Sequence, residues 1–294
     1  GVNAIDTANA YAGGESERIT GRLICDDRDH WILATKLANP MGPGPNDRGL
    51  SRRHMLQAVD VSLTRLGTDW IDVLYLHRED ETTPLEETLA AMAHLVERGK
   101  VHHFGLSNFR AWRVARIAEM CLAMGIAPPI VCQPPYNAMS RGIETELLPC
   151  CAHYRIGVVA YSPLARGVLS GKYAPGATPP EGSRAARHDK RIMQTEFRPE
   201  SLALARQMAE RAAERGLTPT QFALGWVWNN RLVHGVIAGP KTLAQWQGYV
   251  DAWGMPFSAE DEAFVDRLVV AGHASTPHYT DPQYPVTGRE PKIG

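Results

Sequence analysis

Strand-like and helix-like segments alternate along this chain of 294 residues, and this alternation constrains its fold more than any other feature of the sequence. Short runs of β-branched and apolar residues predict strands, and the amphipathic segments between them have the spacing of helices. Strand followed by helix, repeated along a chain, is typical of a parallel sheet covered by helices. The predicted strands cover residues 2–6, 31–36, 72–77, 102–107, 130–133, 157–162 and 234–239. The predicted helices cover residues 51–66, 84–98, 110–124, 145–154, 199–215, 242–253 and 258–270.

Nearly every predicted strand ends in a polar or reactive residue. These residues are Asp6, Lys36, His77, Ser107 with Asn108, Gln133, and Tyr161 with Ser162. Parallel strands share one carboxyl edge, so these side chains would converge there. Functional residues drawn from the ends of many strands are typical of a (β/α)8 barrel, whereas in an open doubly wound sheet they gather at one switch point. The pattern therefore predicts an α/β fold, a (β/α)8 (TIM) barrel, as a single domain over residues 1–294.

The predicted strands number one fewer than the eight that close such a barrel. A strand–helix unit takes roughly 30 residues, and the segments after the seventh strand show no further strand pattern. We therefore expect that the first strand–helix unit is missing from this chain and precedes Gly1 in the natural protein. Two segments fall outside the repeat, an inserted loop at residues 173–198 and a Pro-rich C-terminal tail at residues 271–294. Long loops at the active face of a barrel commonly bind substrate or act as lids.

Composition narrows the classes of function. The chain has 31 Lys and Arg against 32 Asp and Glu, a net charge of −1, which removes the electrostatic case for binding nucleic acid or a membrane surface. No apolar run is long enough to span a membrane. Five cysteines without a CxxC pair indicate reduced thiols, and we expect a cytoplasmic protein. Neither HExxH nor a Cys/His cluster occurs, so no metal is expected.

Short motifs at the strand ends carry a resemblance to a known family. They are Asp6-Thr-Ala-Asn-Ala-Tyr11, Ala34-Thr-Lys36, Val73-Leu-Tyr-Leu-His77, Gly105-Leu-Ser-Asn-Phe109, Gln133-Pro-Pro-Tyr-Asn137, Tyr161-Ser-Pro-Leu-Ala-Arg-Gly-Val-Leu-Ser-Gly-Lys-Tyr173, Gly182-Ser-Arg-Ala185 and Ala238-Gly-Pro-Lys-Thr242. In this order, from Gly1 to about Trp253, the chain resembles the aldo-keto reductases, in particular bacterial members and potassium-channel β-subunits. The resemblance implies an oxidoreductase that moves a hydride between a nicotinamide cofactor and a carbonyl.

Carbonyl reduction explains why four of these residue types belong together. The reaction needs a hydride donor and a proton donor beside the developing alkoxide. A phenol has a pKa of about 10 and donates well only when a neighbouring ammonium lowers it. An aspartate would keep that ammonium charged and oriented. The resemblance implies that Tyr11 is the acid, Lys36 its tuning group, Asp6 the partner of Lys36, and His77 the group that orients the substrate oxygen.

The cofactor residues also come from strand ends and the loops that follow them. No strand is followed by GxGxxG, so a Rossmann site is not expected. The resemblance places Ser107, Asn108 and Gln133 on the nicotinamide carboxamide and Tyr161 on its ring, and amide, hydroxyl and aromatic groups suit those partners. It places Ser162, Leu164, Lys172 and Arg184 along the pyrophosphate.

The adenosine end of the cofactor falls, by resemblance, after the last strand. Gly239, Lys241 and Gln245 lie there. A lysine at a helix N-terminus suits a 2′-phosphate, which favours NADP(H) over NAD. The family usually has a Glu-Asn pair one turn further on, where this chain has Gly248 and Tyr249, so two adenine contacts are lost.

Three other functions compete with an NADPH-dependent aldehyde or ketone reductase. A redox-sensing subunit like the potassium-channel β-subunits is one, although in those proteins an Asn can replace the histidine that is intact here as His77. A keto-sugar reductase of a biosynthetic pathway is another. A barrel hydrolase or isomerase would need more strand-end carboxylates than Asp6 alone. The expected partner is a small carbonyl substrate, and a homo-oligomer is left open.

Overall fold

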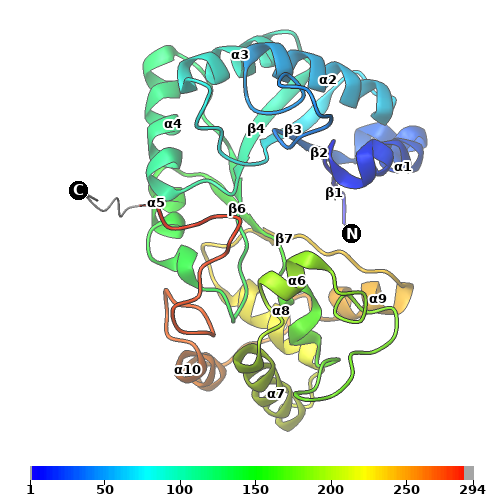
Figure 1. Cartoon of the computed structure of the whole chain (residues 1–294), viewed down its shortest axis with the longest axis vertical. Helices are drawn as coiled ribbons and strands as arrows, with labels where there is room; N and C mark the ends of the chain where they lie inside the picture. Colours follow the sequence, from blue (N-terminus) through cyan, green and yellow to red (C-terminus); the bar gives the residue numbers. More distant parts are fainter. Residues whose placement is uncertain (1, 288–294) are drawn as a thin grey trace. The chain divides into compact units, whose positions relative to one another are not determined.

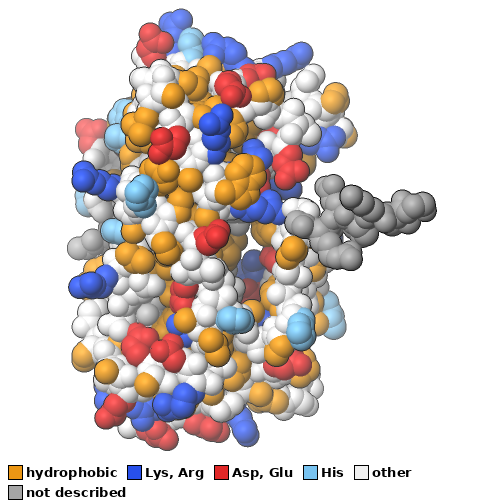
Figure 2. Space-filling model, turned by 90° about the vertical axis from the view of Figure 1, so that its left-hand side faces the viewer, with side chains coloured by type: hydrophobic (Ala, Val, Ile, Leu, Met, Phe, Trp, Pro, Cys, Tyr) orange, Lys and Arg blue, Asp and Glu red, His pale blue; other side chains and the backbone are white. Residues whose placement is uncertain are grey.

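The computed structural model describes residues 2–287, and the chain divides into two compact units. The first unit comprises Gly1–Pro134 and Glu146–Val159, and the second comprises Pro135–Thr145 and Ala160–Gly294. Each unit is described by itself below. Within residues 2–287, no helix is both long and apolar enough to cross a membrane. Figure 2 shows basic and acidic side chains interspersed over the face in view, as the nearly equal numbers of the two charges lead one to expect.

The first unit is a parallel sheet flanked by helices (Figure 1). Its strands pair in chain order, each parallel to the next. They are β1 (Ala4–Asp6), β2 (Ile32–Leu37), β3 (Ile71–Leu76), β4 (Val101–Ser107), β5 (Val131–Gln133) and β6 (Gly157–Ala160), whose last residue begins the second unit. The helices are α1 (Glu15–Ile24), α2 (Arg52–Leu66), α3 (Leu85–Glu97), α4 (Ala111–Met124) and α5 (Leu147–His153).

Both faces of this sheet are buried, as its nearly continuous apolar strands require. Ala34, Val73, Tyr75 and Val131 form a core on one face, and Val159 packs against it. The alternate positions on the same strands are buried as well; they include Leu33, Leu74, Leu106 and Cys132. Two buried faces exclude water from the strands, so polar groups reach the surface at the strand ends.

The second unit is mainly helical. It contains β7 (Gly235–Val236), α6 (Lys190–Gln194), α7 (Pro199–Glu214), α8 (Pro219–Asn229), α9 (Leu243–Asp251) and α10 (Ala259–Leu268). The Ile237 N–H donates to the Ala160 carbonyl at 2.8 Å, where β7 follows β6. The seven strands of the described chain therefore run in the order β1 to β7. A parallel sheet in unbroken chain order is an incomplete (β/α)8 barrel, which confirms the predicted fold class.

All seven predicted strands are present, whereas three helices were not placed by the sequence pattern. They are α1, α6 and α8. Helix α8 is buried on several sides, with Phe222, Leu224, Trp226 and Val227 all enclosed, so it has no polar stripe to reveal its period. Its start was nevertheless signalled by a capping box between Thr218 and Gln221. Helix α6 lies inside the segment predicted as a loop, and the Asp189 carboxylate caps its first turn.

Candidate active site

A buried lysine–aspartate pair lies at the carboxyl end of the first two strands. Lys36 has no exposed surface, and its Nζ forms an ion pair with Asp6 Oδ1 and donates to the Thr7 carbonyl at 2.8 Å. The second oxygen of Asp6 accepts from Gln133 Nε2 at 2.9 Å. A buried charge is tolerated only when it is paired and hydrogen-bonded. Both charges of this pair meet that condition.

The strand register brings these groups together. Asp6 pairs with Ala34 across β1 and β2, and Lys36 lies two positions further along β2 on the same face as Ala34. Lys36 is itself in register with Tyr75 of β3, and its Nζ lies 5.7 Å from the centre of the Tyr75 ring. The ammonium group therefore belongs to the inner face of the sheet, above the core.

Tyr11 lies over this pair. Its ring centre is 5.1 Å from Lys36 Nζ, and 42% of the residue's surface is exposed. A tight turn follows, with Ala12, Gly13 and Gly14 all at positive φ. Gly14 suits this turn, because φ +97° is a backbone conformation that residues with a side chain rarely adopt. Tyr11 thus combines an ammonium neighbour with access for a substrate.

His77 follows β3 directly and is held as a neutral imidazole. Burial, together with the nearby positive charges of Lys36 and Arg78, lowers its pKa to about 3. Asn39 Nδ2 donates to His77 Nδ1 at 3.0 Å, so the neutral ring carries its proton on Nε2. The His77 and Tyr11 rings meet edge to face, with centres 5.7 Å apart. His77 can donate a hydrogen bond through Nε2, but near neutral pH it has no imidazolium proton to give.

The predicted carboxamide-binding residues are tied to these same groups. Ser107 Oγ donates to the Gln133 carbonyl at 2.8 Å. Asn108, at φ +59°, donates through Nδ2 to the His77 carbonyl at 2.9 Å and to Ser107 Oγ at 3.0 Å. Since Gln133 also bonds Asp6, the first unit brings seven of the predicted residues into one hydrogen-bonded and ring-contact cluster. They are Asp6, Tyr11, Lys36, His77, Ser107, Asn108 and Gln133.

Sequence reasoning missed several residues that support this cluster. Asn39, which orients His77, lies just beyond β2, and its place after a strand end was the available signal. Glu17 is fully buried and accepts from Thr35 Oγ1 at 2.7 Å and from Arg65 at 3.2 Å. These bonds fix the start of α1 against β2 and α2, and so fix the turn that carries Tyr11.

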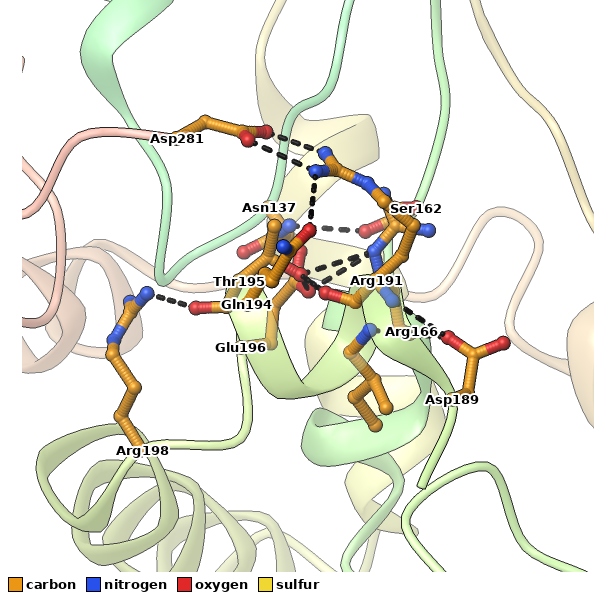
Figure 3. Close-up of polar contacts among 11 residues, drawn as sticks. Asn137, Ser162, Arg166, Asp189, Arg191, Gln194, Thr195, Glu196, Arg198 and Asp281 are labelled. Carbon is orange, nitrogen blue, oxygen red and sulfur yellow. Dashed lines mark hydrogen bonds and ion pairs between the residues drawn. The ribbon is translucent and has the colours of Figure 1, made fainter. Parts of the chain in front are cut away.

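The second unit holds the remaining predicted cofactor residues, beginning with those around Tyr161. Burial raises the pKa of Tyr161 above its usual range. The Ser162 carbonyl accepts from Asn137 Nδ2 at 3.0 Å, and Ser162 itself has φ +55° (Figure 3). Leu164 is buried, and its carbonyl accepts from the Gly167 and Leu169 amides. Leu164 therefore packs within the loop that follows β6.

The positively charged candidates of the second unit lie on its surface. Lys172 is exposed, with its Nζ 5.2 Å from the Tyr173 ring centre. Arg184 is half-buried. Burial raises the pKa of Tyr249 on α9, and the positive charge of Arg184 offsets part of that rise. The Arg184 guanidinium therefore lies close enough to α9 to act on Tyr249 electrostatically.

The start of α9 carries the other three candidates. Gly239, Lys241 and Gln245 are all exposed. Gln245 Oε1 accepts from the Lys241 N–H at 2.7 Å, and the Thr242 hydroxyl accepts from the Gln245 N–H at 3.2 Å. The Thr242 hydroxyl thus caps α9, and the Gln245 oxygen holds the backbone N–H of Lys241 just before the helix. Among residues 2–287, no three His, Cys, Asp or Glu side chains are grouped to hold a metal ion.

The fold and these residues define an α/β-barrel protein with a Tyr–Lys–Asp–His constellation at the carboxyl ends of its strands. The family model described as "Aldo/keto reductase family" matches residues 1–270, and the chain belongs to this family of oxidoreductases, generally dependent on NAD(P). The predicted resemblance is thereby confirmed.

Two groups of curated relatives resemble the chain. A probable voltage-gated potassium channel subunit beta of Arabidopsis thaliana is 38% identical over 251 residues, 84% of this chain and 76% of the relative. An L-glyceraldehyde 3-phosphate reductase of Escherichia coli O157:H7 is 35% identical over 286 residues, 92% of this chain and 81% of the relative. A putative channel subunit beta of Schizosaccharomyces pombe is 35% identical over 253 residues, 83% of this chain and 73% of the relative.

Proposed function

We propose that this protein is an NADPH-dependent oxidoreductase that reduces the carbonyl of an aldehyde or ketone to an alcohol. The observation that carries the proposal is the fully buried Lys36, paired with Asp6, beneath the partly exposed ring of Tyr11. A buried ion pair costs desolvation energy and is weak evidence for stability alone. The Lys36–Asp6 pair lies under the accessible phenol of Tyr11, where it can assist proton transfer.

Tyr11 is the proton donor in this proposal. As hydride reaches the carbonyl carbon, negative charge grows on the oxygen and the Tyr11 hydroxyl transfers its proton there. The Lys36 ammonium, 5.1 Å from the ring centre, stabilises the phenolate left behind. Asp6 keeps Lys36 charged and in place. Neutral His77 donates from Nε2 to the carbonyl oxygen and orients the substrate.

NADP(H) supplies the hydride when bound, and the residues present suit it. Ser107, Asn108 and Gln133 would hold the carboxamide, because their hydroxyl and amide groups already form one hydrogen-bonded set. Tyr161 would pack on the nicotinamide ring. The phosphate side would be held by Ser162, Leu164, Lys172, Arg184, Gly239, Lys241 and Gln245, of which Lys172 and Lys241 present exposed ammonium groups.

Two groups of relatives suggest alternatives within the same family. One is named an L-glyceraldehyde 3-phosphate reductase, which supports sugar-type aldehydes as a substrate class and keeps a keto-sugar reductase among the candidates. Others are named potassium channel subunits beta, which supports a cofactor-binding regulatory subunit as the second candidate function. The complete set of Asp6, Tyr11, Lys36 and His77 favours the enzyme.

The test is the loss of NADPH absorbance with a panel of substrates. The panel contains aromatic aldehydes, aliphatic ketones, α-dicarbonyls, keto-sugars and glyceraldehyde 3-phosphate. We expect turnover with at least one class, abolished in Tyr11→Phe. Tight NADPH binding without turnover of any class would support the regulatory subunit, and absence of NADPH binding would overturn both functions.

A further inference from the structure

A pocket of about 230 Å³ in the first unit is lined by α2, by the loop that joins β2 to α2, and by the turn after β1. A cavity of roughly 150 Å³ can hold benzene, so this pocket has room for a molecule of about nine non-hydrogen atoms. The described residues assigned above to proton transfer or to the cofactor do not line it. The lining residues that decide its chemistry are Asn9, Met41, Asp47, His54, Ala58 and Arg65.

His54 presents an unpaired ring nitrogen in this lining. The residue is 5% exposed, and its Nδ1 lies 3.0 Å from the Asn46 carbonyl. A carbonyl only accepts, so the proton is on Nδ1 and Nε2 is an acceptor. Burial lowers the pKa of His54, although the Asn46 bond and the Asp47 charge act in the opposite direction, so the ring is neutral at neutral pH. Nε2 is buried and has no hydrogen-bond partner within residues 2–287.

Asn9 presents a second unpaired acceptor in the same lining. The residue is 2% exposed, and its backbone N–H donates to the Lys36 carbonyl at 3.0 Å. Its side-chain Oδ1 is buried, and the described part of the chain offers it no hydrogen-bond partner. Buried polar atoms are nearly always hydrogen-bonded, because an unsatisfied one keeps its desolvation cost. Since both unpaired atoms of this pocket are acceptors, a ligand that satisfies them must donate two hydrogen bonds.

The rest of the lining favours a neutral ligand. Asp47 accepts from a backbone N–H of its own loop at 2.9 Å, and Arg65 pairs with Glu17 at 3.2 Å. These two charged groups have opposite signs and already have partners, so the lining gives little advantage to an ion. Met41 and Ala58 add apolar surface. Hydroxyl groups on a short carbon chain supply the donors and also pack against that apolar surface.

The loop that forms one wall is held by its own hydrogen bonds. The Met41 N–H donates to the Asp47 carbonyl at 2.9 Å, and the Gly49 N–H donates to the Ala38 carbonyl at 2.9 Å. His54 is fixed on α2, where its backbone N–H donates to the Ser51 hydroxyl at 3.3 Å. Both walls are therefore in place before a ligand arrives, which reduces the entropic cost of binding.

We propose that this pocket binds a small neutral polyol, whose hydroxyl groups donate to Asn9 Oδ1 and His54 Nε2. The carbon chain of the polyol lies against Met41 and Ala58. Because Asn9 lies two residues before Tyr11, the bound molecule joins the turn that carries Tyr11 to α2. The site goes beyond the proposed reaction and does not depend on it, since a regulatory subunit with this structure would have the same pocket.

The first experiment titrates the full chain, with ¹³C-labelled methionine methyl groups, with glycerol, erythritol and xylitol. The Met41 methyl resonance, assigned from its loss in Met41→Leu, should shift and saturate with at least one of the three. In ¹⁵N-histidine-labelled protein, the His54 Nε2 resonance should shift over the same concentration range. Diglyme, a chain of similar size without a hydrogen-bond donor, is the control and should give no saturable shift. No saturable shift with any of the polyols, or an equal response to diglyme, would overturn the proposal.

The second experiment repeats the methyl titration in variants of the pocket. His54→Phe and Asn9→Leu each remove one acceptor and should weaken polyol binding about three- to tenfold, the usual effect of losing one hydrogen bond. Ala58→Leu keeps both acceptors but fills the pocket, so it should abolish binding. Ala123→Leu makes the same change at an exposed position of α4 and should bind like the unmodified protein. Unaltered affinity in Ala58→Leu, or in both acceptor variants, would place the polyol elsewhere and overturn the assignment.

Discussion

The two units hold their candidate residues in different ways. In the first unit, Lys36 and Ser107 are strand residues with almost no exposed surface, and the Lys36 ammonium and the Ser107 hydroxyl each donate a hydrogen bond to a backbone carbonyl. In the second unit, Lys172, Arg184 and Lys241 lie on loops at the surface, and long-range ion pairs such as Arg191–Asp281 secure the surrounding segments. Proton transfer needs a geometry held to a fraction of an ångström, whereas a large cofactor must enter and leave. The buried residues of the first unit therefore suit proton transfer, and the surface loops of the second unit suit binding and release of a cofactor.

The largest expected effect tests the candidate catalytic residues of the first unit. Tyr11→Phe keeps the ring and removes the hydroxyl, so the hydride step should slow by about 10²–10⁴-fold, the usual contribution of a general acid. Single-turnover oxidation of bound NADPH by a fast aldehyde measures it. NADPH affinity serves as the control and should not change. An unaltered rate would mean that the acid lies elsewhere in the cluster.

Breaking the buried pair should cost both stability and rate. Lys36→Met leaves Asp6 without its cation, and loss of one partner of a buried pair destabilises by about 3–5 kcal/mol. Urea unfolding measures this loss, and single-turnover kinetics should show slower proton transfer as well. Adding Asp6→Asn to Lys36→Met should restore much of the stability but none of the rate. Asp6→Asn alone should slow the reaction less than Lys36→Met, because it acts only through Lys36.

The second unit should respond in affinity rather than in chemistry. Lys241→Ala removes an exposed ammonium, and a charge-assisted hydrogen bond contributes on the order of 1.5–3 kcal/mol. NADPH binding should therefore weaken about tenfold or more, while NADH binding stays the same. Isothermal titration with both cofactors measures the gap between them. Equal affinity of the unmodified protein for the two cofactors would remove the basis for assigning Lys241.

The smallest effect concerns pH. The pKa of His77 is about 3 in the folded protein, below the ordinary value of about 6.5, so between these values the unfolded chain binds the extra proton. The free energy of unfolding should therefore fall as the pH is lowered from 6.5 toward 3. Between pH 7 and pH 5 the loss should be on the order of 1–2 kcal/mol. Chemical denaturation at both pH values should show a smaller difference in His77→Asn.

His54 is the matched control for this pH effect. Burial lowers its pKa too, so His54→Asn should reduce the same pH dependence without touching the Tyr11 site. Reduction rates in the unmodified protein should show no inflection from an imidazole near neutral pH. A rate that titrates near pH 6.5, and loses that inflection in His77→Asn, would contradict the neutral state of His77.

Sequence patterns located most of the first unit because its signals are local. A strand buried on both faces is a short apolar run, and the polar residue that ends it marks the sheet edge. Asp6, Ser107 and Gln133 are the last residues of β1, β4 and β5. His77 follows β3 directly, whereas Lys36 is the last residue but one of β2. Each of these positions follows from burial along a few consecutive residues.

Tertiary structure decided what depends on distant partners. Helix α8 is enclosed by its neighbours, so periodicity could not reveal it. The proton on His77 Nε2 depends on Asn39, 38 residues away, and Arg191 of α6 pairs with Asp281, 90 residues away. By itself the sequence determined the order of strands, the residue types at their ends and the family to which the chain belongs, because hydrophobic period and local motif are properties of neighbouring residues. Which side chains pair, which tautomer forms and which loop is fastened to the tail were decided only by the folded chain, because those contacts join residues whose separation in sequence carries no pattern.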